Sequence, residues 1–222
     1  MPNYYQYLQW SVQSLLEHNK VTKLYVFTED GKLPYTIPCD YEVIKVPKHK
    51  FFTPDNPNMN SHYTWISMAR MLAPELIPNE DKLMYLDVDT IICDSLIPLW
   101  ETDLTGKWFG CIPEVYFKPF GCTYYNAGVL LMNLKQMRQD NATKLFMNEL
   151  NHFRYQYHEQ DVLNKYAVPD NVVAVDTRYN ESNCCGFTDN PAIIHYAGCF
   201  DWYKSKTVYR WEYRERYSGV WG

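Results

Sequence analysis

The sequence predicts an α/β protein with a mainly parallel β-sheet flanked by helices, folded as a single domain over residues 1–222. Helical and strand patterns alternate along the chain. The strands are continuous apolar runs such as "AGVLLMN" and "AIIHY", which is typical of strands covered on both faces. A chain of 222 residues with 46% hydrophobic and 17% aromatic residues is long enough for a substantial core.

The first third of the chain predicts two helices and two strands. Residues 4–19 are expected to form a helix capped by Asn3, because its apolar residues have helical spacing: Leu8, Val12, Leu15 and Leu16. Residues 23–27 and 41–46 are rich in branched and aromatic side chains and are expected to be strands. A second helix is expected over 61–72, ended by Pro74.

The rest of the chain continues the alternation. The expected strands cover 82–87, 107–112, 127–133, 171–176 and 192–196, and the expected helices cover 134–152 and 159–166. A last helix over 207–218 is expected to place aromatic residues of the 200–222 tail on the domain, with an acceptor platform or a membrane-surface anchor as alternatives. No repeat or linker interrupts this pattern.

Composition limits the classes of partner. A net charge of −5 and a pI near 5.7 argue against a nucleic acid polymer. The seven cysteines lack disulfide or zinc spacing, so we expect reduced thiols, with a Cys184–Cys185 disulfide as the alternative. With no apolar run long enough for a transmembrane segment and no secretory leader pattern, the sequence predicts a cytoplasmic protein.

Two acids follow the apolar run "KLMYL". Asp87 and Asp89 are expected at the carboxyl end of a strand, where ligands bind in parallel sheets. Their alternate spacing would direct both carboxylates to one side, where mutual repulsion favours a bound magnesium or manganese ion. The alternative is that these acids only cap a turn, or the short helix expected after Asp94.

Further polar residues follow the later strands. His195 closes the run "AIIH", and an imidazole beside two carboxylates favours manganese among hard cations. Gly198 would let the backbone approach a phosphate closely. Asn126 precedes an apolar strand and suits either a turn or a substrate-facing loop. The segment "HEQD" begins a helix, and its acids suit either catalysis or the helix dipole.

Taken in order, these segments resemble the retaining glycosyltransferases of family 8, which have the GT-A fold and include glycogenin and bacterial galactosyl- and glucosyltransferases. The resemblance extends from Asn3 to about Gly198. It rests on six segments: "NYYQYLQWSVQSLLEHN", "ARMLAPELIP", "YLDVDTIICDSL", "YYNAGVLLMNL", "EQDVLN" and "IIHYAG".

The resemblance implies a metal-dependent, retaining hexosyltransferase that uses UDP-glucose or UDP-galactose and a glycan, lipid-linked or protein acceptor. It implies Mn²⁺ (or Mg²⁺) ligands at Asp87, Asp89 and His195. It implies donor contacts at Asn3, Tyr4, Arg70, Val88, Glu159 and Gly198, with Tyr4 stacked on uracil. It implies catalytic roles for Asn126, Gln160 and Asp161, by front-face attack or through a covalent intermediate.

The sequence departs from the family pattern twice. The strand that usually precedes the Asn-Tyr pair is not present before Asn3, so we expect unpaired edges on the neighbouring strands and a homodimer or a partner's strand as one way to cover them. The family's phosphate-binding lysine after His-x-x-Gly is also replaced, with Lys204 and Lys206 as substitutes. An inactive nucleotide-sugar-binding protein is therefore the main alternative. A haloacid-dehalogenase-type phosphatase is a weaker one, because Thr90 lies three residues after Asp87 rather than four.

Overall fold

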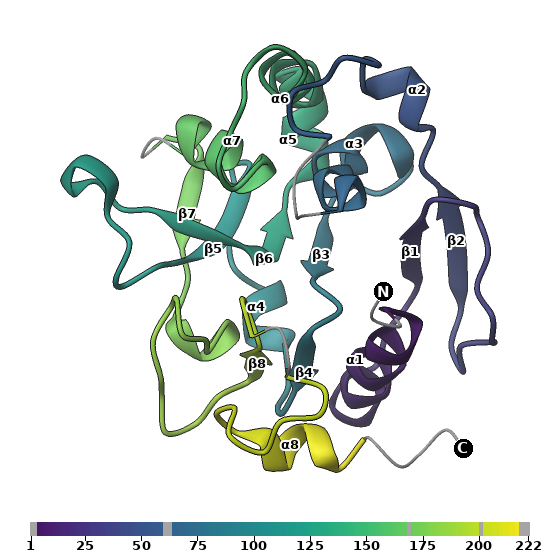
Figure 1. Ribbon diagram of the computed structural model, residues 1–222, viewed down its shortest axis with the longest axis vertical. Coiled ribbons are helices and arrows are strands. Elements are labelled where there is room, and N and C mark those ends of the chain that lie inside the picture. Colours follow the sequence, from purple (N-terminus) through teal and green to yellow (C-terminus); the bar gives the residue numbers. More distant parts are fainter. Residues whose placement is uncertain (1–3, 60–63, 168–169, 200–201, 218–222) are drawn as a thin grey trace.

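A four-stranded sheet forms the centre of the molecule (Figure 1). The computed structural model describes residues 4–59, 64–167, 170–199 and 202–217. The sheet has the order β3 (Leu83–Leu86), β6 (Tyr125–Met132), β5 (Phe109–Pro113) and β7 (Val172–Ala174). Because β6 is antiparallel to β3 and β5, and β5 is parallel to β7, the strands β3, β5 and β7 share one direction. The predicted α/β fold is confirmed, with β6 running against a mainly parallel sheet.

Two smaller sheets flank the central one. Strands β1 (Leu24–Thr28) and β2 (Tyr41–Lys45) are parallel and were both expected. Strands β4 (Thr90–Ile92) and β8 (Ile193–His195) are antiparallel, and Thr90 lies opposite His195. Strand β4 was not predicted, because this short strand is defined by its pairing with a segment about a hundred residues away. That pairing brings the segment after Asp89 to His195.

Strands β1 and β3 each keep an unpaired edge. Within the described residues, β1 pairs only with β2, and β3 only with β6. One cleft is lined by every residue of both strands, and each residue of β3 remains partly exposed. These are the exposed edges that the sequence analysis expected, and such edges accept an added strand readily.

The helices cover the sheets on several sides. They are α1 (Tyr4–His18), α2 (Lys48–Phe51), α3 (Ala73–Leu76), α4 (Ile97–Trp100), α5 (Leu134–Gln139), α6 (Ala142–His152), α7 (Glu159–Tyr166) and α8 (Trp211–Glu215), with 3-10 turns η1 (Trp65–Leu72), η2 (Pro119–Gly121) and η3 (Thr177–Tyr179). The main core lies between β5, β6 and the helical layer of η1, α5, α6 and α7.

Two helix predictions were wrong in detail. In place of the helix expected over 61–72, of which 61–63 lie outside the described residues, the structure has the 3-10 helix η1 over Trp65–Leu72, which continues into α3. Pro74 does not end it, since proline in a first helical turn leaves no partner unsatisfied.

The helix expected over 134–152 breaks into α5 and α6 at Asn141, whose φ of 55° is left-handed. Asp140 anchors the break by accepting a 2.6 Å hydrogen bond from Trp108 Nε1.

The aromatic tail packs on the body of the protein. Trp202 is buried, stacks on Tyr196 with ring centroids 4.8 Å apart, and contacts Tyr7 and Trp10 of α1. These contacts support the packed-tail interpretation, although α8 is shorter than the 207–218 helix expected. They also explain why α1 buries Tyr7 and Trp10 more deeply than the leucines from which the helix was predicted. The predicted cap, Asn3, lies outside the described residues.

Candidate active site

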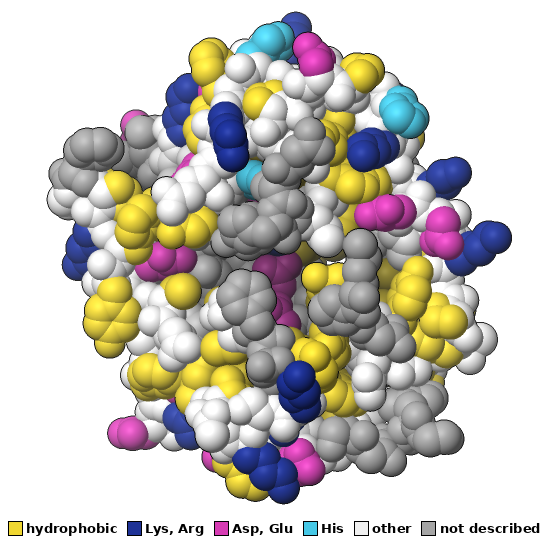
Figure 2. Space-filling model, viewed as in Figure 1, with side chains coloured by type: hydrophobic (Ala, Val, Ile, Leu, Met, Phe, Trp, Pro, Cys, Tyr) yellow, Lys and Arg dark blue, Asp and Glu magenta, His cyan; other side chains and the backbone are white. Residues whose placement is uncertain are grey.

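A cleft of about 1870 Å³ opens beside the central sheet, lined by β1, β3, α1 and the turns that follow β3 and β8. Figure 2 shows acidic side chains gathered at the centre of this face of the molecule, in a hollow. Asp87, Asp89, Glu114, Glu159 and His195 are among the lining residues. The polar residues singled out from separate parts of the sequence therefore meet in one place.

The acid pair occupies a turn between β3 and β4. The N–H of Asp87 donates to the carbonyl of Gly128 at 2.8 Å, and the carbonyl of Asp89 accepts from the N–H of Tyr196 at 3.0 Å. These bonds tie the turn to β6 and to the end of β8, and it is the turn rather than a straight strand that makes the side chains converge. The alternative of a helix cap is not supported, since the N-cap of α4 is Leu96 and it has no side-chain cap hydrogen bond.

His195 completes a group whose ligand atoms all lie within 4.8 Å of one another. Its Nε2 is 3.3 Å from Asp89 Oδ1 and 3.8 Å from Asp87 Oδ2. Burial alone would lower the pKa of His195, but the carboxylates of Asp89 and Asp87 outweigh it and the pKa is raised. Two carboxylates and one imidazole nitrogen form a donor set suited to a divalent metal such as manganese.

The histidine ring lies directly over Gly128 of β6. A Cβ added at Gly128 would lie 2.1 Å from His195 Cε1, far inside contact distance. The glycine in "YYNAGV" lies inside β6 and is therefore required by the ring of a residue sixty-seven positions later. Neither segment alone reveals this requirement.

Gly128→Ala is expected to displace the His195 ring and weaken manganese binding by about 10- to 100-fold, as loss of a ligand's support does. The cost in folding stability is expected to be about 1–3 kcal/mol, typical of overpacking. Manganese titration and thermal unfolding measure the two effects. Gly110→Ala in β5 is the matched control, because its added Cβ would meet neighbours at 3.4 Å. Unchanged manganese affinity in Gly128→Ala would contradict the contact.

Arg70, which is 5% exposed, binds two acids. Its Nη2 is 2.9 Å from Asp87 Oδ1, its Nε is 3.3 Å from Glu159 Oε1, and its Nη1 donates to the carbonyl of Ala127. Tyr85 also donates to Asp87 Oδ1 at 2.6 Å and lies under the guanidinium. Burial would lower the pKa of Arg70, but Asp87, Tyr85 and Glu159 together raise it. Arg70 is thus a fixed positive charge that holds one metal-ligand candidate in place.

The cleft around the acid pair is nevertheless acidic. Asp87, Asp89, Glu114 and Glu159 line it, and the charge of Arg70 is already shared between two of them. The expected substitutes for the family lysine do not line the cleft: Lys204 lies over the Tyr203 ring and Lys206 over the Trp211 ring. A diphosphate would be repelled here unless a divalent cation accompanied it.

The three predicted catalytic residues are placed differently from one another. Gln160 lines the cleft, where its Oε1 accepts from Ala127 N–H at 2.9 Å and its Nε2 donates to Glu114 Oε1 at 3.1 Å. Asn126 also lines the cleft and donates to Glu114 Oε1 at 3.0 Å. Asp161 is not among the cleft-lining residues, because its carboxylate accepts from Tyr124 Oη at 2.5 Å and from Tyr157 N–H at 2.8 Å. Asp161 therefore positions the loop before α7 and does not face the cleft.

The predicted donor residues also mostly reach the cleft. Tyr4 is 48% exposed at its edge, and Val88 and Gly198 line it. Gly198 has a φ of 69°, which only glycine adopts without strain. Glu159 is buried, and burial raises its pKa despite the neighbouring Arg70. Asn3 lies outside the described residues.

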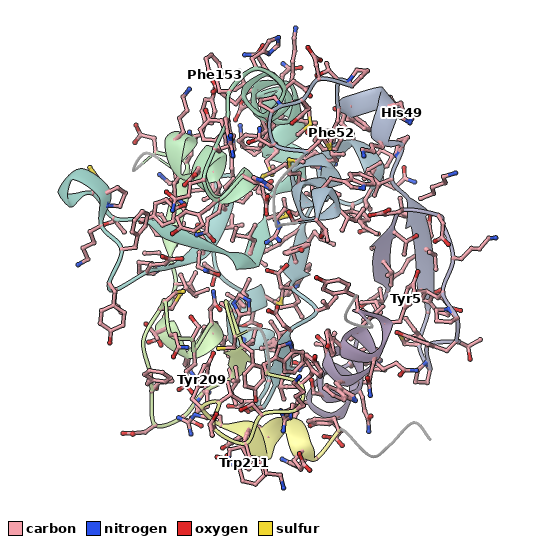
Figure 3. All side chains as sticks on the ribbon, in the orientation of Figure 1. Tyr5, His49, Phe52, Phe153, Tyr209 and Trp211 are labelled. Atoms are coloured by element: carbon pink, nitrogen blue, oxygen red, sulfur yellow. The ribbon has the colours of Figure 1, made fainter. Side chains whose placement is uncertain are left out.

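Some residues of the site were missed. Glu114 joins Asn126 to Gln160, and Asn180 contacts His195. Glu114 directly follows strand β5 and Asn180 directly follows the 3-10 turn η3, and neither position carries a local signal in the sequence. The tail also reaches the site: Tyr209, labelled in Figure 3, donates its hydroxyl to the carbonyl of His195.

The fold agrees with comparisons to known proteins. The family profile described as Glycosyl transferase family 8 matches residues 1–202. The chain belongs to glycosyl transferase family 8. Among solved structures, it is similar to the galactosyltransferase LgtC in complex with donor and acceptor sugar analogs, with a TM-score of 0.82, 25% sequence identity, and coverage of 98% of this chain and 92% of that one.

Curated relatives of this family 8 chain are also glycosyltransferases by name. GlyF of Streptococcus pneumoniae serotype 4 is 26% identical over 86% of this chain and 52% of its own length. A putative glycosyltransferase of Haemophilus influenzae is 31% identical over 59% of this chain and 45% of its own length. The chain thus spans about half the length of the curated relatives it matches.

Two further predictions concern the cysteines and transmembrane segments. All seven cysteines are free, so Cys184 and Cys185 form no disulfide. Within the described residues, no helix has the length and apolarity needed to cross a membrane.

Proposed function

We propose that this family 8 member is a metal-dependent, retaining hexosyltransferase that moves glucose or galactose from a UDP-sugar to a glycan, lipid-linked or protein acceptor. The observation that carries the proposal is the convergence of Asp87, Asp89 and His195 at the floor of the cleft. Their ligand types suit manganese, with magnesium as the alternative. When bound, such an ion would neutralise the diphosphate and stabilise the departing UDP.

The chain's own residues have distinct roles in this proposal. Arg70 holds Asp87 in place and contributes positive charge beside the phosphates. Tyr4 offers an exposed ring for stacking on the base, and Val88 and Gly198 line the donor region. Glu159 fixes Arg70 from the other side.

Gln160 and Asn126 face the region where the sugar would lie. Because Gln160 Oε1 already accepts from Ala127 N–H, and its Nε2 donates to Glu114, both ends of this amide are fixed by the protein. This arrangement supports a role in orienting the sugar more than a role as a free nucleophile. With Asp161 engaged by Tyr124 and Tyr157, front-face attack is the mechanism we favour.

Isothermal titration of UDP with and without manganese tests the proposal, followed in the same sample by donor hydrolysis across a panel of UDP-sugars. We expect manganese-dependent UDP binding and hydrolysis of one sugar, which would identify the donor. UDP binding without hydrolysis or transfer would instead favour an inactive nucleotide-sugar-binding protein. No binding in either condition would contradict both.

The inactive-protein alternative is favoured by one observation, the position of Lys204 and Lys206 outside the cleft. Membership of family 8 argues against the phosphatase. The homodimer and the cytoplasmic location stay predictions, and the unpaired edges of β1 and β3 are where a second chain would pair.

A further inference from the structure

His195 has a second ring nitrogen that faces away from the acid pair. His195 Nδ1 lies 2.8 Å from Asn180 Oδ1, and the two residues are 3% and 0% exposed. Asn180 follows the 3-10 turn η3, and the backbone pairs the next residue, Glu181, with β8: Glu181 N–H donates to Ile193 and His195 N–H donates to Glu181. The contact is therefore held by backbone on both sides.

The orientation of each amide in this contact follows from a backbone donor. The N–H of Gly128 can only donate, and it points at Asn126 Oδ1 at 2.9 Å. The Asn180 atom that lies 2.9 Å from the same oxygen must then be the amide nitrogen, Nδ2. The remaining atom of Asn180, Oδ1, can only accept, so the His195 nitrogen facing it must carry a proton.

We propose that Asn180, held by Asn126, is a positioning residue that fixes the ring of His195 as the tautomer protonated at Nδ1. The neutral ring then presents the lone pair of Nε2 to the space between Asp87 and Asp89, the form required of a metal ligand. The proposal rests on the proposed metal site. Gly128 supports this arrangement in two ways: its N–H donates to Asn126 Oδ1, and it has no Cβ that would clash with the His195 ring.

The same chain of hydrogen bonds reaches the sugar side of the cleft. Asn126 Nδ2 donates to Glu114 Oε1, and Gln160 Nε2 donates to that same oxygen. Glu114 Oε1 thus accepts hydrogen bonds from two side-chain amides. One belongs to Asn126, which contacts Asn180 and through it His195, and the other belongs to Gln160. A change at Asn180 is therefore expected to loosen His195 first and Gln160 less.

The first test measures manganese affinity of Asn180→Leu, an apolar side chain of similar size. We expect affinity about 10- to 100-fold weaker than that of the natural protein. Asn58→Leu is the matched control: Asn58 is 1% exposed and donates to the carbonyls of Leu150 and Phe153, away from the cleft. It should lower thermal stability without changing manganese affinity. Equal manganese affinity in Asn180→Leu and the natural protein would overturn the proposal.

The second test reads the tautomer directly and needs no metal. Long-range ¹H–¹⁵N correlation spectra of histidine-labelled, metal-free protein, recorded where His195 is neutral, should show a proton on Nδ1. In Asn180→Leu the proton should move to Nε2, toward the carboxylates, whereas Asn180→Asp should keep it on Nδ1 because a carboxylate oxygen still accepts there. A proton on Nε2 in the natural protein would overturn the proposal. If the natural protein bound no manganese, the proposed function would fail, and the spectra alone would decide the role of Asn180.

Discussion

Asp89→Asn is expected to reduce manganese-dependent UDP binding and donor hydrolysis by about a thousand-fold, the equivalent of the several kcal/mol that a metal contributes. The reason is that a neutral amide oxygen is a much weaker ligand than a carboxylate, and it leaves the cleft with one fewer charge to hold the cation. Asp89 is the better choice of the two acids, since Asp87 also binds Arg70 and Tyr85.

The same substitution is expected to leave the fold standing. The side chain of Asp89 is 29% exposed and its ion-pair partner is His195, while its carbonyl keeps the hydrogen bond from Tyr196 N–H. Thermal unfolding checks this point, and titration of manganese and UDP checks the loss. Asp55→Asn is the matched control, because Asp55 is exposed and does not line the cleft. Unchanged UDP release in Asp89→Asn would refute the metal role.

The grouping of Asp87, Asp89 and His195 could be predicted because its signals are local. Asp87 directly follows the apolar strand β3 and His195 ends the apolar strand β8, and a strand end is recognisable from a few neighbouring residues. The same holds for most strands, whose branched and aromatic residues need no partner to be identified. The helix break at Asn141 was missed because a tertiary contact, the hydrogen bond from Trp108 to Asp140, anchors it, whereas Pro74 was misjudged because it lies in the first turn of α3, where proline is tolerated.

The support around the metal site could not be predicted, because it depends on residues far apart in sequence. Asn180 orients His195 only because η3 is placed beside β8, and Gly128 is required only because the His195 ring lies over β6. Asp161, whose catalytic role the family resemblance implied, is turned by helix α7 toward Tyr124 and Tyr157, and that role stays a prediction. Strand and helix patterns give positions along the chain, but not which neighbours share a hydrogen bond.

Arg70→Met is expected to be the most destabilising single change in the site. It removes a guanidinium that is 5% exposed and leaves Asp87 and Glu159 without their shared cation. Breaking one side of a buried ion pair costs about 3–5 kcal/mol, which corresponds to a fall in melting temperature of roughly 10 °C for a chain of this size. Thermal and urea unfolding measure the loss. Arg138→Met is the control, because Arg138 binds the exposed Asp81 and should cost about 1 kcal/mol or less.

The pH dependence distinguishes this explanation from a simple loss of packed volume. Burial already raises the pKa of Glu159, while Arg70 lowers it, so Arg70→Met should raise that pKa further. Between the unfolded and the raised folded pKa, the folded variant then holds a proton that the unfolded chain does not. Its stability therefore rises as the pH falls through the raised folded pKa toward the unfolded value, and is lost as the pH rises again.

Arg70→Met combined with Glu159→Gln should recover part of the stability at neutral pH, because the unpaired buried charge is gone. The loss of unfolding free energy in Arg70→Met could instead be the same at neutral and mildly acidic pH, with no stability regained in the double variant. That result would show that Arg70 stabilises the site by filling space rather than by its charge.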